Sequence, residues 1–321
     1  MLKLTGITWI TTYNCNLSCN HCFFETKGEK KYMNPDMIDL VLKDFPYDKH
    51  MFWQHLSGGE IFIDQKKLKE ILKRIRKYFQ KNIGLSTNAY WATEIKKTEQ
   101  TVSELQKIGV TGIAVSADYY HQQQMPETGP GNLVKVISQS SLKTHTYIMG
   151  ARLAEGIQGA EKINKETELI TNRVDGGAGF PVASATERSI GKGSAINIPK
   201  KRKIPQGKCT ELNTCLGERS PFNPAMVWID PYGNVMICYG IVIGNVFQTP
   251  FREIVENYNV SAIPILEKLD KEGPKGLFSE ALEQGLIVPE EFYDECDLCY
   301  QSRKYLRNLY PEVFKPDECY P

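Results

Sequence analysis

This sequence has no long apolar run and almost no net charge, and these two absences exclude several classes of protein. No stretch is apolar enough to cross a membrane, and no export signal stands at the N-terminus. We therefore expect a soluble, cytoplasmic protein that does not act on a membrane. The formal net charge of +1, from 39 basic and 38 acidic residues, argues against a nucleic-acid partner.

Cysteine, in contrast, is abundant for a chain without an export signal. Nine cysteines are present. A reducing compartment would keep them from pairing as disulfides, so metal ligation is their expected use. A chain of 321 residues, of which 41% are hydrophobic, can bury a substantial core. We expect one large and one small domain.

Three of the cysteines form a C-x-x-x-C-x-x-C motif. Cys15, Cys19 and Cys22 directly follow the apolar, β-branched run 4–10, which predicts a first strand. Three thiolates would hold three irons of a cubane cluster and leave the fourth iron open to a ligand. With His21 they could instead fill a tetrahedral zinc site, although structural zinc normally uses two separated pairs. Three unrelated buried cysteines are the remaining alternative.

Glycines and a carboxylate end the next predicted strand. Gly58, Gly59 and Glu60 follow the short apolar segment 52–57. Glycines let a backbone approach a ligand closely, and a carboxylate beside them can pair with an ammonium group. An ordinary turn is the alternative.

Strand and helix patterns alternate through about residue 185, which predicts a parallel sheet with outer helices. Small polar residues end several of the strands, at the edge where α/β barrels build their sites. Six strand–helix units are too few to close an eight-stranded barrel, so we expect an open, partial one. The predicted strands lie at 4–10, 52–57, 83–88, 112–118, 143–149 and 179–183, and the helices between the early strands at 35–45 and 65–81.

Composition changes to glycine, proline and a basic run between residues 191 and 208, which predicts a linker or an exposed loop. Beyond it, the pattern 226–238 predicts two strands joined by a Pro-Tyr-Gly-Asn turn, which would deliver Cys238. Cys296 and Cys299 form a C-x-x-C pair. These three thiols and one upstream cysteine would make a second site with four ligands, suited to an iron–sulfur cluster or to zinc.

The triad, its place after the first strand, and the Gly-Gly-Glu sequence at this order and spacing resemble the radical S-adenosylmethionine superfamily. The resemblance implies an α/β fold with a partial (β/α)6 barrel over residues 1–190. It further implies a linker over 191–208 and a smaller α+β, twitch-like domain over 209–321. At the triad it implies a 4Fe–4S cluster whose open iron binds the amino and carboxylate groups of S-adenosylmethionine.

The same resemblance implies where that cofactor binds. Gly58, Gly59 and Glu60 would hold the methionine amine. The ribose and carboxylate would be met by Ser86, Asn88, Ser116, Asp118, Arg152 and Arg188. Helix capping is the alternative for any single polar residue of this set. Whether His121 faces the site or caps a loop stays open.

In the C-terminal region the chain resembles a twitch domain, in which a cysteine, a hairpin cysteine and a later C-x-x-C bind an auxiliary cluster. That resemblance assigns a second 4Fe–4S cluster to Cys215, Cys238, Cys296 and Cys299, with Cys209 as an alternative to Cys215. The larger SPASM domain holds two auxiliary clusters and needs more cysteines than this chain has. One complete cluster is therefore expected, and two clusters with three ligands each are the alternative.

The activity implied is reductive cleavage of S-adenosylmethionine to a deoxyadenosyl radical, which takes hydrogen from an unactivated C–H bond. The electron would come from a donor such as flavodoxin or ferredoxin. The layout, including residues 116–121, is similar to epimerases of ribosomally made peptides, so a peptide is the expected substrate. In those enzymes a cysteine directly after the hairpin ligand donates hydrogen. Tyr239 stands at that catalytic position here, which leaves Cys209 or Cys319 to take the role.

Two other functions stay open. A dehydrogenase acting on a small molecule is similar to other twitch-bearing members. The short stretch before Cys15 leaves no room for a separate leader-peptide domain and so favours this second function slightly. A zinc-stabilised binding protein is the third, from a different class, but it leaves the Gly-Gly-Glu sequence unexplained.

Overall fold

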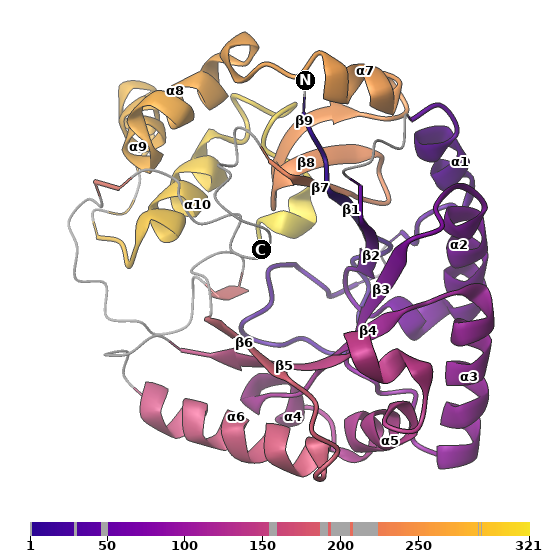
Figure 1. The fold of residues 1–321 in the computed structure, drawn as a ribbon. Helices are drawn as coiled ribbons and strands as arrows, with labels where there is room; N and C mark the ends of the chain where they lie inside the picture. The colour runs from indigo at the N-terminus through magenta and orange to yellow at the C-terminus, as the bar shows by residue number, and fades with distance from the viewer. Residues whose placement is uncertain are drawn as a thin grey trace.

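The strands of the described residues join into one nine-stranded sheet in a computed structural model, with the order β6-β5-β4-β3-β2-β1-β7-β8-β9 (Figure 1). The structure describes residues 2–28, 31–45, 51–153, 159–186, 192–193, 206–207, 224–287, 289 and 291–321. Strands β1 to β6 pair in parallel, and β7 pairs in parallel with β1. Strand β8 pairs antiparallel with both β7 and β9. The C-terminal strands therefore extend the N-terminal sheet.

The strand bounds place the polar residues predicted for the site at one edge. Because parallel strands point the same way, the carboxyl ends of β1 to β6 meet along this edge. The strands are β1 Gly6–Ile10, β2 Trp53–Ser57, β3 Asn82–Thr87, β4 Gly112–Ser116, β5 Tyr147–Arg152, β6 Val182–Thr186, β7 Met226–Ile229, β8 Asn234–Cys238 and β9 Ile241–Asn245.

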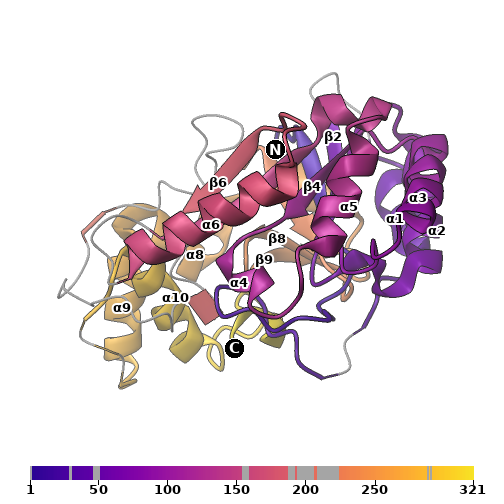
Figure 2. The same ribbon diagram turned by 90° about the horizontal axis from the view of Figure 1, so that it is seen from below.

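Helices cover the outer face of the curved sheet (Figures 1 and 2). Helix α2 shows why: Leu68, Ile71, Leu72 and Ile75 repeat at helical spacing and are all buried, while its lysines and arginines lie on the other side. The helices of this half are α1 Asp36–Leu42, α2 Gln65–Tyr78, α3 Ile95–Ile108, α4 Tyr119–Gln122, α5 Thr128–Ile137 and α6 Ala160–Asp175, with 3-10 turns η1 Ile61–Asp64 and η2 Ser141–His145.

The fifth strand begins later than the sequence predicts. The prediction was 143–149, but β5 begins at Tyr147 because the preceding residues form η2. Ser140 starts that turn: its hydroxyl oxygen accepts a hydrogen bond from the Leu142 N–H at 3.2 Å. Strand β5 then continues to Arg152, so this arginine is the last residue of the strand and not a residue beyond it.

The sixth strand is also displaced, from the predicted 179–183 to Val182–Thr186. The carboxylate of Asp175, the last residue of α6, accepts hydrogen bonds from the N–H groups of Gly179 and Phe180 at 3.0 and 2.8 Å. Those contacts keep the start of the predicted segment in the turn after the helix.

The C-terminal region packs several helices beside the hairpin β7–β8 and the further strand β9. Its last residues return to the sheet, where the Val242 N–H donates to the Val313 carbonyl at 2.8 Å. The Glu25 N–H donates to the Glu318 carbonyl at 2.7 Å, so the C-terminal segment also lies beside the loop that carries the cysteine triad. Its helices are α7 Phe251–Glu256, α8 Pro264–Glu272, α9 Pro274–Glu283 and α10 Glu295–Leu306, with η4 Val260–Ala262 and η5 Asp317–Cys319.

Within the described ranges, no helix combines the length and the apolar character needed to span a membrane. Of the predicted linker 191–208, only residues 192–193 and 206–207 are described. The division into domains at that segment therefore stays a prediction.

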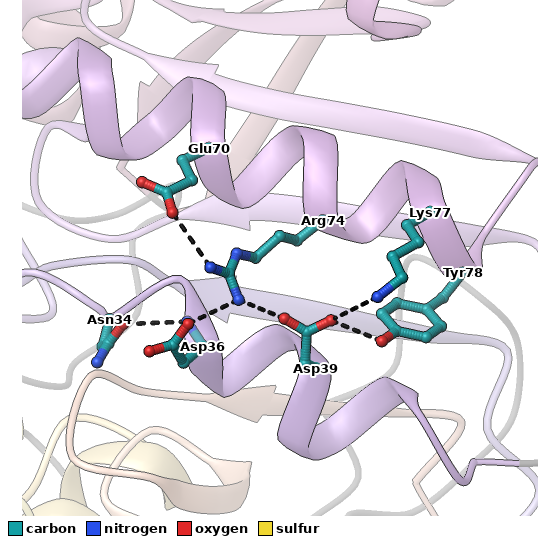
Figure 3. Close-up of polar contacts among 7 residues, drawn as sticks. All are labelled: Asn34, Asp36, Asp39, Glu70, Arg74, Lys77 and Tyr78. Carbon is teal, nitrogen blue, oxygen red and sulfur yellow. Dashed lines mark hydrogen bonds and ion pairs between the residues drawn. The ribbon is translucent and has the colours of Figure 1, made fainter.

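Helices α1 and α2 are joined by a network of charged side chains (Figure 3). Asp39 of α1 accepts a hydrogen bond from the Tyr78 hydroxyl at 2.6 Å and pairs with Arg74 and Lys77 of α2. The Tyr78 hydrogen bond is the largest influence on the Asp39 carboxyl, and together with Arg74 and Lys77 it holds the pKa below its usual value. The exposed Asp36 lies at the rim of this network, where its carboxylate contacts Arg74 at 2.7 Å.

We predict that Asp39→Asn lowers the free energy of unfolding of the metal-free protein by about 1–2 kcal/mol at neutral pH, because charge-assisted hydrogen bonds are lost. Because the pKa of Asp39 is lowered, this stabilisation is present above pH ~4 and disappears as the carboxylate is protonated below it. Urea unfolding followed by circular dichroism measures the loss.

Asp36→Asn is the matched control, since the Asp36 side chain is 71% exposed. We expect it to cost less than about 0.5 kcal/mol. Equal losses for the two variants would show that the half-buried Asp39 contributes no more than the exposed Asp36 at the rim.

Candidate active site

The cysteine triad lies on the loop that follows β1, here called the triad loop and comprising residues 12–24. Cys19 is buried, Cys15 and Cys22 are half-buried, and all three are free thiols. The loop turns tightly, with the Cys22 N–H donating to the Cys19 carbonyl at 3.2 Å. The Leu17 N–H points at the Cys15 sulfur at 3.4 Å, and the Phe24 N–H at the Cys22 sulfur at 3.5 Å.

Burial controls the protonation of these thiols. It raises the pKa of Cys15 to about 12, with smaller increases from the charges of Glu60 and Cys22. The pKa of Cys19 is raised still further, again chiefly by burial and then by Cys22. These mutual effects show that the thiols share one site. Three thiolates would repel one another there unless a positively charged metal group compensates them, as it does in metal–thiolate sites.

The two glycines after β2 hold the triad loop by its backbone. The Gly59 N–H donates to the Thr12 carbonyl at 2.7 Å, and the Glu60 N–H donates to the Asn14 carbonyl at 2.9 Å. A Cβ on Gly59 would lie 2.0 Å from the Asn14 carbonyl oxygen, and one on Gly58 would lie 2.3 Å from that of Thr12. Gly58 also has a φ of +141°, which a residue with a Cβ rarely adopts. The close approach that requires glycine is therefore to the triad loop itself.

The Glu60 carboxylate is buried and connects this loop to the end of β3. It accepts hydrogen bonds from the Phe62 N–H at 3.0 Å, the Thr87 hydroxyl at 2.8 Å and the Asn88 N–H at 2.8 Å. Burial raises the pKa of Glu60 to about 7, although these three hydrogen bonds oppose the shift. These hydrogen bonds give Glu60 a structural role. Its pairing with the methionine amine stays a prediction.

Asn88 points toward the triad. Its side-chain amide donates to the Asn16 Oδ1 at 2.9 Å and lies 3.9 Å from the Cys15 sulfur. Ser86, two residues earlier, contacts the His55 Nε2 at 2.7 Å. Burial lowers the pKa of that histidine to about 4. The end of β3 therefore brings Asn88 to the cluster site and couples Ser86 to the neighbouring strand.

Asp118, after β4, is the N-cap of α4. Its carboxylate accepts from the N–H groups of Tyr120 and His121 at 3.0 Å, and from that of Ala151 at 3.3 Å. The His121 Nδ1 lies 2.9 Å from both carboxylate oxygens. Burial opposes the charged forms of both groups, but their attraction outweighs it: the pKa of Asp118 is lowered and that of His121 is raised.

His121 is hydrogen-bonded to the N-cap Asp118, and its ring lies beside the triad loop. Its ring centroid is 5.0 Å from that of His21 in the triad loop. Ligand atoms of His21, Asp118 and His121 lie within 4.8 Å of one another. Because Asp118 already accepts three backbone hydrogen bonds and one from His121, we interpret this group as a hydrogen-bonded dyad beside the triad.

Arg152 and Ser116 end their strands at the same edge. The Arg152 Nε is buried and has no hydrogen-bond partner within the described part of the chain. Such a donor fits an anionic group of a ligand, for example a carboxylate. Ser116 is half-buried at the end of β4. Arg188, Cys209 and Cys215 lie outside the described residues, so their predicted roles stay predictions.

The remaining cysteines gather around the hairpin and the C-terminus. Cys238 ends β8, Cys296 and Cys299 lie on α10, and Cys319 is buried in η5. The Cys319 sulfur is 3.9 Å from the Tyr13 hydroxyl, which also donates to the Asp230 Oδ2 at 3.1 Å. The structure thus places Cys319 beside the triad loop, and its predicted catalytic role stays a prediction.

Tyr239, directly after Cys238, connects the two cysteine groups. Its ring centroid lies 4.8 Å from Phe23, 5.2 Å from Phe24 and 5.3 Å from Trp228. Phe23 and Phe24 follow Cys22 in the triad loop. The Tyr239 ring therefore packs between the hairpin and the triad loop, and its predicted catalytic role stays a prediction.

Sequence reasoning missed several residues of this region. Thr87 and Tyr13 carry hydrogen bonds described above; Thr87 stands between Ser86 and Asn88, and Tyr13 stands two residues before Cys15. Lys192, in the predicted linker, donates through its N–H to the Cys22 carbonyl at 2.9 Å. Arg303 was also missed. It stands four residues after Cys299 on the same face of a helix, and that spacing could have indicated that the two side chains are neighbours.

Comparison with known proteins shows a family match over the N-terminal part of the chain. Residues 9–142, which hold the triad, the glycines, Asn88 and the Asp118–His121 dyad, match the sequence profile described as the Radical SAM superfamily. The chain is similar to the radical SAM superfamily over this segment. It is an enzyme of the kind that uses a 4Fe–4S cluster and S-adenosylmethionine, and the buried thiols and the unpaired Arg152 donor fit these cofactors.

A curated relative and two solved structures extend the likeness beyond the matched segment. The chain is 25% identical to the "Putative peptide biosynthesis protein YydG" of Bacillus subtilis (strain 168), over 94% of this chain and 93% of the relative. Streptococcus suis SuiB, solved bound to precursor peptide SuiA, has a TM-score of 0.54 at 13% identity, covering 99% of this chain and 76% of that one.

The second solved structure, anSMEcpe with bound AdoMet, has a TM-score of 0.56 at 12% identity and covers 96% of this chain and 97% of that one. At such identities the two structures show a shared fold. They agree with the partial, open radical SAM barrel predicted from the sequence, since neither edge strand of the described sheet pairs to close it.

We predict that Gly59→Ala strongly reduces the iron bound by this radical SAM protein after anaerobic reconstitution. The added Cβ would force the Asn14 carbonyl away and displace the loop that carries Cys15. Iron and sulfide analysis measures the effect. The control is Gly131→Ala on α5, where a Cβ meets nothing within 4 Å. We expect iron content there to stay at the wild-type value, and a wild-type content in Gly59→Ala would contradict the proposed function of the glycine.

Proposed function

We propose that this radical SAM enzyme modifies a ribosomally made peptide by abstracting hydrogen from one of its C–H bonds. The observation that carries the proposal is the triad loop held against the Gly58-Gly59-Glu60 backbone beside Asn88 and the Asp118–His121 dyad. The name of the Bacillus subtilis relative includes peptide biosynthesis, and SuiB was solved with a precursor peptide, which supports a peptide substrate.

Each group at the strand ends has a part in this proposal. Cys15, Cys19 and Cys22 would hold three irons of the cluster. Bound there with S-adenosylmethionine, the cluster supplies one-electron cleavage to methionine and a deoxyadenosyl radical, which takes a hydrogen atom from the substrate. Arg152 would donate its unpaired N–H to the cofactor carboxylate. Asn88, already directed at Cys15, would position the cofactor beside the open iron.

The remaining residues are assigned to the cofactor because they lie at the carboxyl ends of the parallel strands. The backbone of Gly58, Gly59 and Glu60 lies at the edge where the methionine amine would bind. Ser116 and Asp118 end or follow β4 at the same edge, where the ribose would lie. The Asp118 carboxylate is occupied by backbone donors and His121, so we assign it to holding His121 in place. The electron would come from a donor of the flavodoxin or ferredoxin class.

We further propose that the C-terminal region holds an auxiliary 4Fe–4S cluster. Cys238, Cys296 and Cys299 are the described thiols of this site, and Cys215 was the predicted fourth ligand. Their placement on β8 and α10, with Tyr239 packed toward the triad loop, supports a cluster near the substrate. Such a cluster would accept an electron from a substrate radical in an oxidative modification.

The first test uses Cys15→Ala/Cys19→Ala/Cys22→Ala against the wild type, each reconstituted anaerobically. We expect the wild type to bind about two cubanes and the triple variant about one. With dithionite as reductant, only the wild type should release deoxyadenosine from S-adenosylmethionine. Zinc in place of iron, or cleavage that survives loss of the triad, would refute the assignment.

The second test concerns the substrate. The reconstituted enzyme is incubated in deuterated water with a short peptide encoded beside its gene, and the product is analysed by mass spectrometry. Deuterium gained at one residue indicates epimerisation, whereas loss of two hydrogens indicates oxidation or cross-linking. An unmodified peptide, with turnover of a small alcohol or amine instead, would contradict a peptide substrate. Here the expected result is a change confined to the peptide.

A further inference from the structure

A positively charged side chain lies fully buried among the C-terminal cysteines. Arg303 of α10 is 1% exposed. It stands four residues after Cys299 and seven after Cys296, so the three side chains share one face of the helix. Burial lowers the pKa of Arg303, but Tyr320 first, and then Cys299 and Cys238, outweigh it and raise the pKa, and the guanidinium also hydrogen-bonds with Cys299, which places both thiols close to it.

The other contacts of Arg303 are neutral. Its Nη1 donates to the Tyr239 carbonyl at 2.8 Å and to the Tyr320 hydroxyl at 2.9 Å. The Tyr320 hydroxyl in turn donates to the Gly240 carbonyl at 2.5 Å. Arg303 therefore ties the hairpin turn after Cys238 to the last residues of the chain. Within the described residues, no carboxylate pairs with it.

One donor of the guanidinium is left over. The Nε of Arg303 is buried and has no hydrogen-bond partner among the described residues. Burying a cation without an anion costs several kcal/mol, and leaving a buried N–H unsatisfied adds to that cost. The Nε of the neighbouring Arg307 is also buried without a partner among the described residues, but Arg307 forms an ion pair with Asp317 while lying over the same Tyr320 ring. Asp317 therefore balances the charge of Arg307, whereas no carboxylate of the described residues balances the charge of Arg303.

Cys319 adds a third thiol to the surroundings of this cation. Burial raises the pKa of Cys319, and the positive charge of Arg303 opposes that rise, which places Cys319 near the guanidinium. Burial also raises the pKa of the Tyr320 hydroxyl that Arg303 contacts, with smaller increases from Cys319, Cys299 and Cys238. Thiol groups on β8, α10 and η5 thus face one buried guanidinium. A cluster held by thiolates carries net negative charge and becomes more negative on reduction, so it would supply the missing anion.

We propose that Arg303 is the counter-cation of the auxiliary iron–sulfur cluster and raises its reduction potential. The inference rests on the auxiliary cluster of the proposed function. Arg303 would act as a positioning and tuning residue: its charge favours the reduced cluster, and its free Nε–H would donate to a cluster or cysteine sulfur. Hydrogen bonds to sulfur and nearby charge are two of the features that set cluster potentials.

The experiment measures the auxiliary cluster alone, in the chain that carries Cys15→Ala/Cys19→Ala/Cys22→Ala. Arg303→Gln, Arg303→Lys and Arg307→Gln are added to it separately. Iron is counted, and the midpoint potential is measured by redox titration followed by electron paramagnetic resonance. We expect Arg303→Gln to shift the potential to more negative values, Arg303→Lys to shift it less, and Arg307→Gln to leave it unchanged.

The outcomes separate this inference from the function on which it rests. If the triad-free chain binds no iron, the auxiliary cluster fails and the inference fails with it. If iron is bound but Arg303→Gln leaves the potential unchanged, or shifts it no more than Arg307→Gln, the inference alone is wrong. Loss of iron from Arg303→Gln with retention in Arg303→Lys supports the need for a cation. Equal loss from both Arg303 variants would overturn a role for the charge.

Discussion

The site depends on two backbone hydrogen bonds between the loop after β2 and the loop after β1. Gly59 and Glu60 donate to the Thr12 and Asn14 carbonyls at 2.7 and 2.9 Å. The carbonyl oxygen of Asn14 occupies the space where a Cβ of Gly59 would lie, so only glycine allows this distance. Because Asn14 directly precedes Cys15, the position of the first thiol follows from this contact, and the buried Glu60 carboxylate fixes the end of β3 to the same point.

The parallel sheet brings the other predicted site residues to the same place as this contact. Strands β1 to β5 end at one edge, so the triad loop, Asn88, Asp118 and Arg152 meet there although they are up to 137 residues apart, from Cys15 to Arg152. Strand β7 lies on the other side of β1, which brings the hairpin and Cys238 into the same sheet. The two cysteine groups are therefore neighbours through Tyr239, Phe23 and Phe24, and an electron acceptor near the first site is physically reasonable.

Electrostatics distinguishes the two groups of cysteines. At the triad, burial raises the pKa of Cys15 and Cys19 and the Lys192 charge opposes it only weakly, so a metal group would compensate the thiolates. In the C-terminal group, a buried guanidinium is already present, and no carboxylate among the described residues pairs with it. The first arrangement suits a cluster with an open iron that receives a ligand. The second suits a cluster whose charge the protein itself balances.

The sequence alone was enough for the class of fold, and it also predicts the first cysteine site. Period-two and helical patterns are local, and the triad spacing is local too, so strands β1 to β4, the helix α2, and Cys15, Cys19 and Cys22 could be read directly. The first residues of β5 and β6 could not be predicted in this way, because hydrogen bonds to the side chains of Ser140 and Asp175 determine where these strands begin. The tertiary structure alone decided that Gly59 serves the triad loop, that β7 adjoins β1, and that Arg303 is buried among cysteines without a carboxylate in the described chain. These are contacts between residues distant in sequence, and packing and burial, which no local pattern encodes, determine them.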